Sequence, residues 1–223
     1  MDMNSKLKHV LENTEVVRAP RQTLATFGST SIDYYVVTSL AGGASVVRDG
    51  RVMAERPRVV TPLYLLNVEG FSEQAKGYAE RMFTEHPDEP GIFYSYKNVP
   101  GNMEVVSERV EVVLEKLGER LEEEDNPLSA ILRGIEESWD VSLLVFIYDL
   151  TSRSFRSNAA DFTRKGFLDI DPAGVSRDAR EHIEELFRRA GRDPSCAPAL
   201  AVELKRWEVF SEYQDRFFSL FRR

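Results

Sequence analysis

The sequence predicts an α+β protein, in which an N-terminal, mostly antiparallel sheet with two helices is followed by an all-helical C-terminal subdomain. Segments rich in β-branched and aromatic residues dominate roughly the first hundred residues. Apolar residues then recur at intervals of three and four from Val106 to Leu121, and similar spacing continues after Pro127. We therefore expect a strand-rich α+β subdomain over residues 1–126 and a helical subdomain over residues 127–223.

The expected elements of the first subdomain are short and bounded by glycine or proline. Asp49-Gly50 tolerates positive φ angles, which predicts a two-residue hairpin turn between Val46–Arg48 and Arg51–Met53. Gly42-Gly43 predicts a loop or bulge, and Pro100-Gly101 predicts a further turn. The remaining expected elements are a leading helix at Lys6–Asn13, strands at Thr23–Phe27, Ile32–Leu40, Arg58–Asn67 and Gly91–Tyr96, and a helix from Ser72 to His86.

An acidic run from Glu122 to Asp125 precedes Pro127, and we read it as a solvated linker or helix end between the subdomains. The stretch Val141–Tyr148 is almost continuously apolar and is expected to be a central buried helix with Asp140 as its N-cap. The expected helices of the second subdomain are Leu128–Ser138, Val141–Thr151, Phe155–Lys165, Arg177–Arg189, Leu200–Trp207 and Val209–Phe221.

Charge and composition narrow the classes of function. The net charge of −8 repels phosphate backbones, so general nucleic-acid binding is disfavoured. No window approaches 18 uncharged apolar residues, so we expect no membrane segment. The single cysteine, Cys196, excludes an intramolecular disulfide and fits the cytoplasm; it lies in a loop without a close basic neighbour and is expected to be inert.

Motifs that bind nucleotides or metals are missing from the sequence. Neither GxxxxGK[ST] nor a GxGxxG turn after a strand occurs, and no GxSxG motif marks a nucleophilic serine. The three histidines, His9, His86 and His182, lie in different expected elements. We therefore assign no cofactor and no metal ion.

One segment suggests DNA binding. Residues 141–170 combine an apolar helix, a polar turn at Thr151–Ser154 and an amphipathic helix that ends in Arg164-Lys165-Gly166, a pattern similar to the recognition helix of winged-helix domains. Asp161, Asp169 and Asp171 add negative charge beside it, and a plain pair of packed helices is the competing interpretation. The expected DNA contacts would be Arg153, Arg156, Ser157, Asn158, Arg164 and Lys165.

A second alternative is a metal-assisted hydrolase, which needs several carboxylates in one cleft. Glu69 or Glu73 from the first subdomain and Asp140 or Asp149 from the second could meet at their junction. Asp149 is also expected to serve as a salt-bridge partner near the end of its helix.

The closing segment carries an aromatic series that must be covered. It can pack on the chain's own helices, on a second copy or on another protein. The working hypothesis is a non-catalytic cytoplasmic binding, regulatory or scaffold protein, with the DNA-binding regulator and the hydrolase as alternatives. The series comprises Leu204, Trp207, Phe210, Tyr213, Phe217, Phe218 and Phe221.

Overall fold

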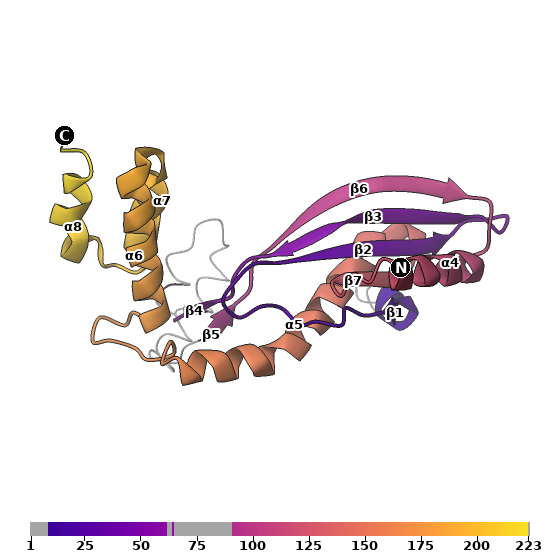
Figure 1. Cartoon of the computed structure of the whole chain (residues 1–223), viewed down its shortest axis with the longest axis horizontal. Helices are drawn as coiled ribbons and strands as arrows, with labels where there is room; N and C mark the ends of the chain where they lie inside the picture. Colours follow the sequence, from indigo (N-terminus) through magenta and orange to yellow (C-terminus); the bar gives the residue numbers. More distant parts are fainter. Residues whose placement is uncertain (1–8, 62–63, 65–90, 223) are drawn as a thin grey trace. The chain divides into compact units, whose positions relative to one another are not determined.

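The computed structural model describes residues 9–61, 64 and 91–222, and its elements are shown in Figure 1. The chain forms two compact units, each assembled from two segments. The first unit contains Met1–Pro57 and Tyr94–Asn158, and the second contains Arg58–Phe93 and Ala159–Arg223. This division differs from a single boundary after residue 126, because residues 127–158 belong with the sheet.

The first unit is built on a five-stranded mixed sheet with the order β1-β7-β2-β3-β6 (Figure 1). The pairs β2–β3 and β3–β6 are antiparallel, β7 lies parallel to β2, and β1 closes the other side antiparallel to β7. The predicted α+β class is confirmed. The strands are β1 (Glu15–Arg18), β2 (Thr30–Ser39), β3 (Ser45–Ala54), β6 (Tyr96–Val106) and β7 (Ser129–Gly134).

A helix packs on each face of this sheet. Helix α4 (Val110–Glu123) buries Val113, Leu117 and Leu121 against one face, where Val37 of β2 points. Helix α5 (Trp139–Arg164) covers the opposite face, where the neighbouring residue Val36 points. Because successive side chains of a strand point to opposite faces, one strand serves both cores. The helix predicted from the apolar spacing Val106–Leu121 is confirmed from Val110 onward, whereas Val106 belongs to β6.

The helix predicted at Leu128–Ser138 is wrong for most of its length, since β7 occupies Ser129–Gly134. Ala130, Ile131 and Leu132 are all fully buried, because alternate side chains enter the two cores on either face of the sheet. A strand covered on both faces reads as a continuous apolar run, which periodicity alone does not distinguish from a buried helix.

The hairpin predicted at Asp49-Gly50 is also wrong, because both residues lie in the middle of β3. A side chain at Gly50 would overlap the ring and hydroxyl of Tyr34 and lie 2.9 Å from the Val99 carbonyl oxygen, so glycine makes room for a buried aromatic ring. The chain turns instead at Gly42-Gly43, where both φ angles are positive and Leu40 N donates to the Ala44 carbonyl.

Two predicted helices, Val141–Thr151 and Phe155–Lys165, form the single helix α5, so no turn occurs at Thr151–Ser154. The hydroxyl groups of Thr151 and Ser154 donate to the carbonyl groups four residues earlier, at 2.6 and 2.7 Å. The polar residues expected to break the helix are accommodated within it. The helix is also less buried than predicted, since Leu144 and Tyr148 are 62% and 76% exposed.

In its described residues, the second unit contains a two-stranded sheet and the helices α6, α7 and α8. Its core surrounds the fully buried Trp207, whose ring lies 4.8 Å from that of Tyr64. Asp178 accepts the Val59 N–H, and Ser176 both caps α6 and donates to the Val59 carbonyl, which ties the first strand to the helix. The elements are β4 (Arg58–Val60), β5 (Gly91–Phe93), α6 (Arg177–Arg192), α7 (Ala197–Arg206) and α8 (Phe210–Ser219), with a 3-10 turn at Pro194–Cys196.

The remaining predicted elements have mixed outcomes. Residues 9–13 of the leading helix are helical, and the strand predicted at Ile32–Leu40 is confirmed as β2. The segment Thr23–Phe27 is not a strand, because the Leu24 and Ala25 N–H groups bond to side-chain hydroxyls. The helix predicted from Ser72 to His86 lies outside the described residues.

The role of Gly50 yields a prediction. Gly50→Ala is expected to lower the free energy of unfolding by about 1–3 kcal/mol, because the added methyl group overpacks the site beside Tyr34. Gly118→Ala, in α4 with open space around it, is the matched control and is expected to raise stability by about 0.5–1 kcal/mol. Urea denaturation of both variants measures the difference; equal stability of Gly50→Ala and the parent protein would contradict the packing.

Candidate functional site

The candidate site is the edge of the five-stranded sheet formed by β6. Strand β6 is eleven residues long, forms the outer edge of the sheet next to β3, and has exposed residues along most of its length (Figure 1). Among the described strands, none pairs with its outer side. An exposed strand of this length offers a row of backbone donors and acceptors to another chain.

The register shows which residues of β6 face outward. Leu40 N donates to the Ala44 carbonyl at 2.8 Å, so the even-numbered residues that follow in β3 bond to β2 and the odd-numbered ones bond to β6. Ser45 opposes Val106 and Val47 opposes Glu104, so these two β6 residues direct their backbone groups inward. Their neighbours, Met103 and Val105, therefore direct N–H and C=O groups to the open edge.

A bulge separates this open segment from the rest of β6. The register shifts between Arg48 and Gly50, so that Gly101 and Asn102 together oppose Asp49. Asp49 accepts the Asn102 N–H at 2.9 Å, and its carboxylate fills the space that a Cβ at Gly101 would need. The turn predicted at Pro100-Gly101 is thus a bulge within a strand, and residues 103–106 form a separate pairing segment.

A hollow of about 450 Å³ lies beside this segment, where α4 leaves β3 and β6 uncovered. Its lining combines apolar side chains with carboxylates, an amide and two cationic side chains. Such a combination of an apolar base with few polar groups is common in binding sites. The lining residues are Tyr35, Val47, Asp49, Asn102, Glu104, Val106, Glu108, Val113, Lys116, Leu117 and Arg120.

The cations of this hollow already have partners. Lys116 donates to both oxygens of Glu108 at 2.6 and 2.8 Å, and the Arg120 guanidinium lies 5.0 Å from the centre of the Tyr35 ring. In contrast, Asp49 and Glu104 form no ion pair with any other described residue. The side of the hollow next to β6 therefore has an excess of negative charge.

On the opposite face of the sheet, Arg48 opposes Met103 but is neutralised by Glu136. The guanidinium donates to both carboxylate oxygens at 2.8 and 2.5 Å and stacks 5.3 Å from the Trp139 ring. Hydrogen bonding from Arg48 lowers the pKa of Glu136, and burial only partly opposes this effect. The charges of this partly buried pair therefore neutralise each other.

The structure places the expected DNA contacts along α5 and just beyond it. Asn158 is buried, accepting from the Thr26 hydroxyl and donating to the Tyr94 hydroxyl. Arg153 pairs with Asp149 at 2.9 Å, and Arg164 pairs with Asp161. The other three, Arg156, Ser157 and Lys165, are exposed. The predicted helix–turn–helix motif is absent, because α5 is continuous.

The two described members of the expected acidic site lie nine residues apart on one helix and do not come together. Asp140 and Asp149 are exposed on α5; Asp140 accepts the Val141 N–H and Asp149 pairs with Arg153, as expected of a salt-bridge residue. Glu69 and Glu73 lie outside the described residues. Over residues 9–61, 64 and 91–222, no three His, Cys, Asp or Glu side chains gather as a metal ion would require.

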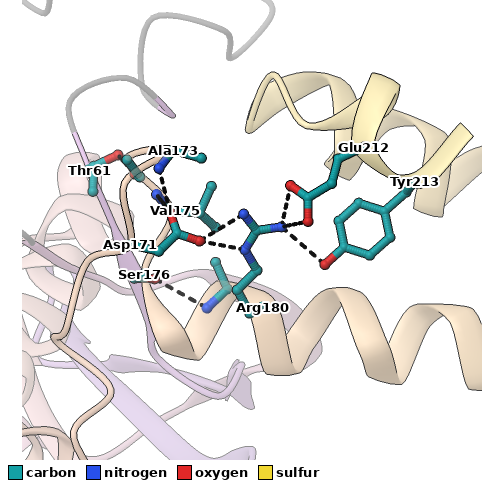
Figure 2. A network of polar contacts seen from close by, with 10 residues as sticks. Thr61, Asp171, Ala173, Val175, Ser176, Arg180, Glu212 and Tyr213 are labelled. Atoms are coloured by element: carbon teal, nitrogen blue, oxygen red, sulfur yellow. Dashed lines mark hydrogen bonds and ion pairs between the residues drawn. The ribbon is translucent and has the colours of Figure 1, made fainter.

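The second unit contains a dense polar network around Arg180 (Figure 2). Arg180 donates to Asp171 at 2.7 Å, to both oxygens of Glu212 at 2.8 Å and to the Tyr213 hydroxyl at 3.1 Å. Burial would raise the pKa of Asp171, but the Val175 N–H and the Arg180 guanidinium outweigh it and lower that pKa. The charges of the network are paired, and its contacts link α6 to the preceding loop and to α8.

The C-terminal aromatic series is partly covered by its own unit. Tyr213 lies 5.4 Å from Phe187 of α6, and Phe217 is buried, whereas Phe218 and Phe221 remain 46% and 54% exposed. Cys196 is a free thiol in a 3-10 turn. No helix in the described part of the chain is long and apolar enough to cross a membrane.

The open edge predicts a pattern of amide exchange. The N–H groups of Met103 and Val105 are expected to exchange rapidly with deuterium, whereas those of Glu104 and Val106 are protected by bonds to β3. Exchange followed residue by residue by NMR measures this alternation. Equal protection at all four amides would mean that the edge is already paired.

Comparison with known proteins gives no relative for this arrangement: no family model, curated protein or solved structure matches the chain significantly.

Proposed function

We propose that this chain is a non-catalytic cytoplasmic binding protein whose partner is another polypeptide, which adds a strand to β6. The open backbone groups of Met103 and Val105 carry the proposal. Native proteins usually shorten, charge or cover such edges. Strand addition is a recurring mode of peptide recognition in which main-chain hydrogen bonds supply affinity.

The side chains around the edge support the same function. Met103 and Val105 are 65% and 59% exposed on one face of the sheet, and the hollow lined by Glu104 and Val106 lies on the other. A strand placed along residues 103–106 would therefore find contacts for alternate side chains on both faces. The free thiol of Cys196, the only cysteine, is consistent with a cytoplasmic setting.

Val105→Pro tests the strand addition. Proline removes the outward N–H of Val105 and leaves the inward groups of Glu104 and Val106 intact, so the fold should persist while peptides bind roughly tenfold more weakly. Peptides selected from a displayed random library on the parent protein serve as probes, with affinities measured by titration.

Val105→Thr is the matched control, because it keeps both the N–H and the β-branched shape, and it should bind as the parent does. Selected peptides that bind Val105→Pro with undiminished affinity would refute strand addition at this edge. Circular dichroism of each variant establishes that the fold is retained.

Self-association through α8 and the residues that follow it is a second proposal, favoured by the exposure of Phe218 and Phe221. Sedimentation velocity is expected to show a concentration-dependent dimer that the double variant Phe218→Ser/Phe221→Ser abolishes. Phe155→Ser, which changes a comparably exposed aromatic residue of α5, should leave the dimer intact. A parent protein that stays monomeric at all concentrations would contradict this proposal.

A further inference from the structure

Glu104 occupies the position of β6 that a side chain of an added strand would approach most closely. Met103 and Val105 direct their backbone groups outward, so they would form the hydrogen-bonded positions with a new strand. Glu104, between them, would form a non-hydrogen-bonded pair, in which opposing Cα atoms are only about 4.5 Å apart in an antiparallel arrangement. The charge of the partner residue opposite Glu104 should therefore affect binding.

Electrostatics favour a cation at that position. Glu104 and Asp49 line the same hollow, and neither carboxylate has an ion pair among the described residues. The nearby cations are engaged, Lys116 with Glu108 and Arg120 with Tyr35 and, at 3.6 Å, with Glu124. An acidic side chain in the partner would meet two carboxylates, and both cations that line the hollow in the described structure are engaged, whereas a lysine or arginine would complete the site.

The flanking positions favour apolar side chains. Met103 and Val105 point to the opposite face from Glu104, and both are more than half exposed. Partner residues on either side of the basic residue would lie over them, and cross-strand apolar pairs stabilise such contacts. The basic side chain and its two neighbours thus face different surfaces of the sheet.

We infer that the partner of β6 is an extended peptide segment with the pattern apolar–basic–apolar, in which the basic residue opposes Glu104 and the apolar residues oppose Met103 and Val105. This inference rests on the strand addition proposed above. A second copy of β6 fits poorly, because a symmetric antiparallel pairing centred on Glu104 would place two Glu104 carboxylates opposite each other, between chains of net charge −8.

Two blocked peptides test the inference, Thr-Thr-Val-Lys-Val-Thr-Thr and Thr-Thr-Val-Glu-Val-Thr-Thr, each titrated into the full chain by NMR. The lysine peptide is expected to bind about two- to fivefold more tightly, with the preference shrinking as salt is added. In Glu104→Lys the preference should reverse. Glu119→Lys, an exposed residue of α4 that does not line the hollow, gives the same change in net charge and should keep the original preference.

The possible outcomes distinguish a failure of the basic residue opposite Glu104 from a failure of strand addition itself. Equal binding of both peptides to the parent and to Glu104→Lys, combined with weaker binding to Val105→Pro, would overturn the basic residue but leave strand addition standing. Binding of either peptide that Val105→Pro does not weaken would overturn strand addition, and the inference with it. Chemical-shift changes confined to residues 103–106 and the lining of the hollow are the expected pattern.

Discussion

The parallel pairing of β7 with β2 is the constraint on which the sheet unit depends. It places Ala130, Ile131 and Leu132 in the middle of the sheet, where alternate side chains enter the cores beneath α4 and α5. The helices that flank β7 in the chain must then lie over β7 and β2, on opposite faces. Strand β6, two positions beyond β2, is left at the margin of both helical layers, which explains why it is exposed.

The elements with a regular helical period could be predicted from the sequence, as could the loop at Gly42-Gly43. Helix α4 was found because Val110, Val113, Leu117 and Leu121 face one core and charged residues face water. Strand β7 was missed, since a strand buried on both faces has no alternation to detect. The turn predicted at Asp49-Gly50 is wrong because Gly50 is needed for tertiary packing. It leaves space for the Tyr34 ring, and local turn preferences do not include such contacts.

The sequence contains few signals that predict the candidate site at the edge of β6. Met103-Glu104-Val105-Val106 carries a short strand signal, but Pro100-Gly101 before it is typical of a turn after a strand. Only the register reveals that the chain continues through a bulge and which residues face outward. Chemical type alone favours residues such as Asn158 and Asp149, but Asn158 is buried and Asp149 is paired with Arg153 in its own helix.

The bulge at Gly101 and Asn102 also sets the lifetime of any complex at this edge. By dividing β6, it limits the continuous run beyond the bulge to residues 103–106, so a strand bound there would form few backbone hydrogen bonds before the ladder is interrupted. Contacts of this small size dissociate quickly, and differences in affinity between partners arise mainly in the dissociation rate. The same interruption would limit the stacking of identical chains into a long ladder, so an edge divided in this way suits short-lived contacts more than permanent assembly.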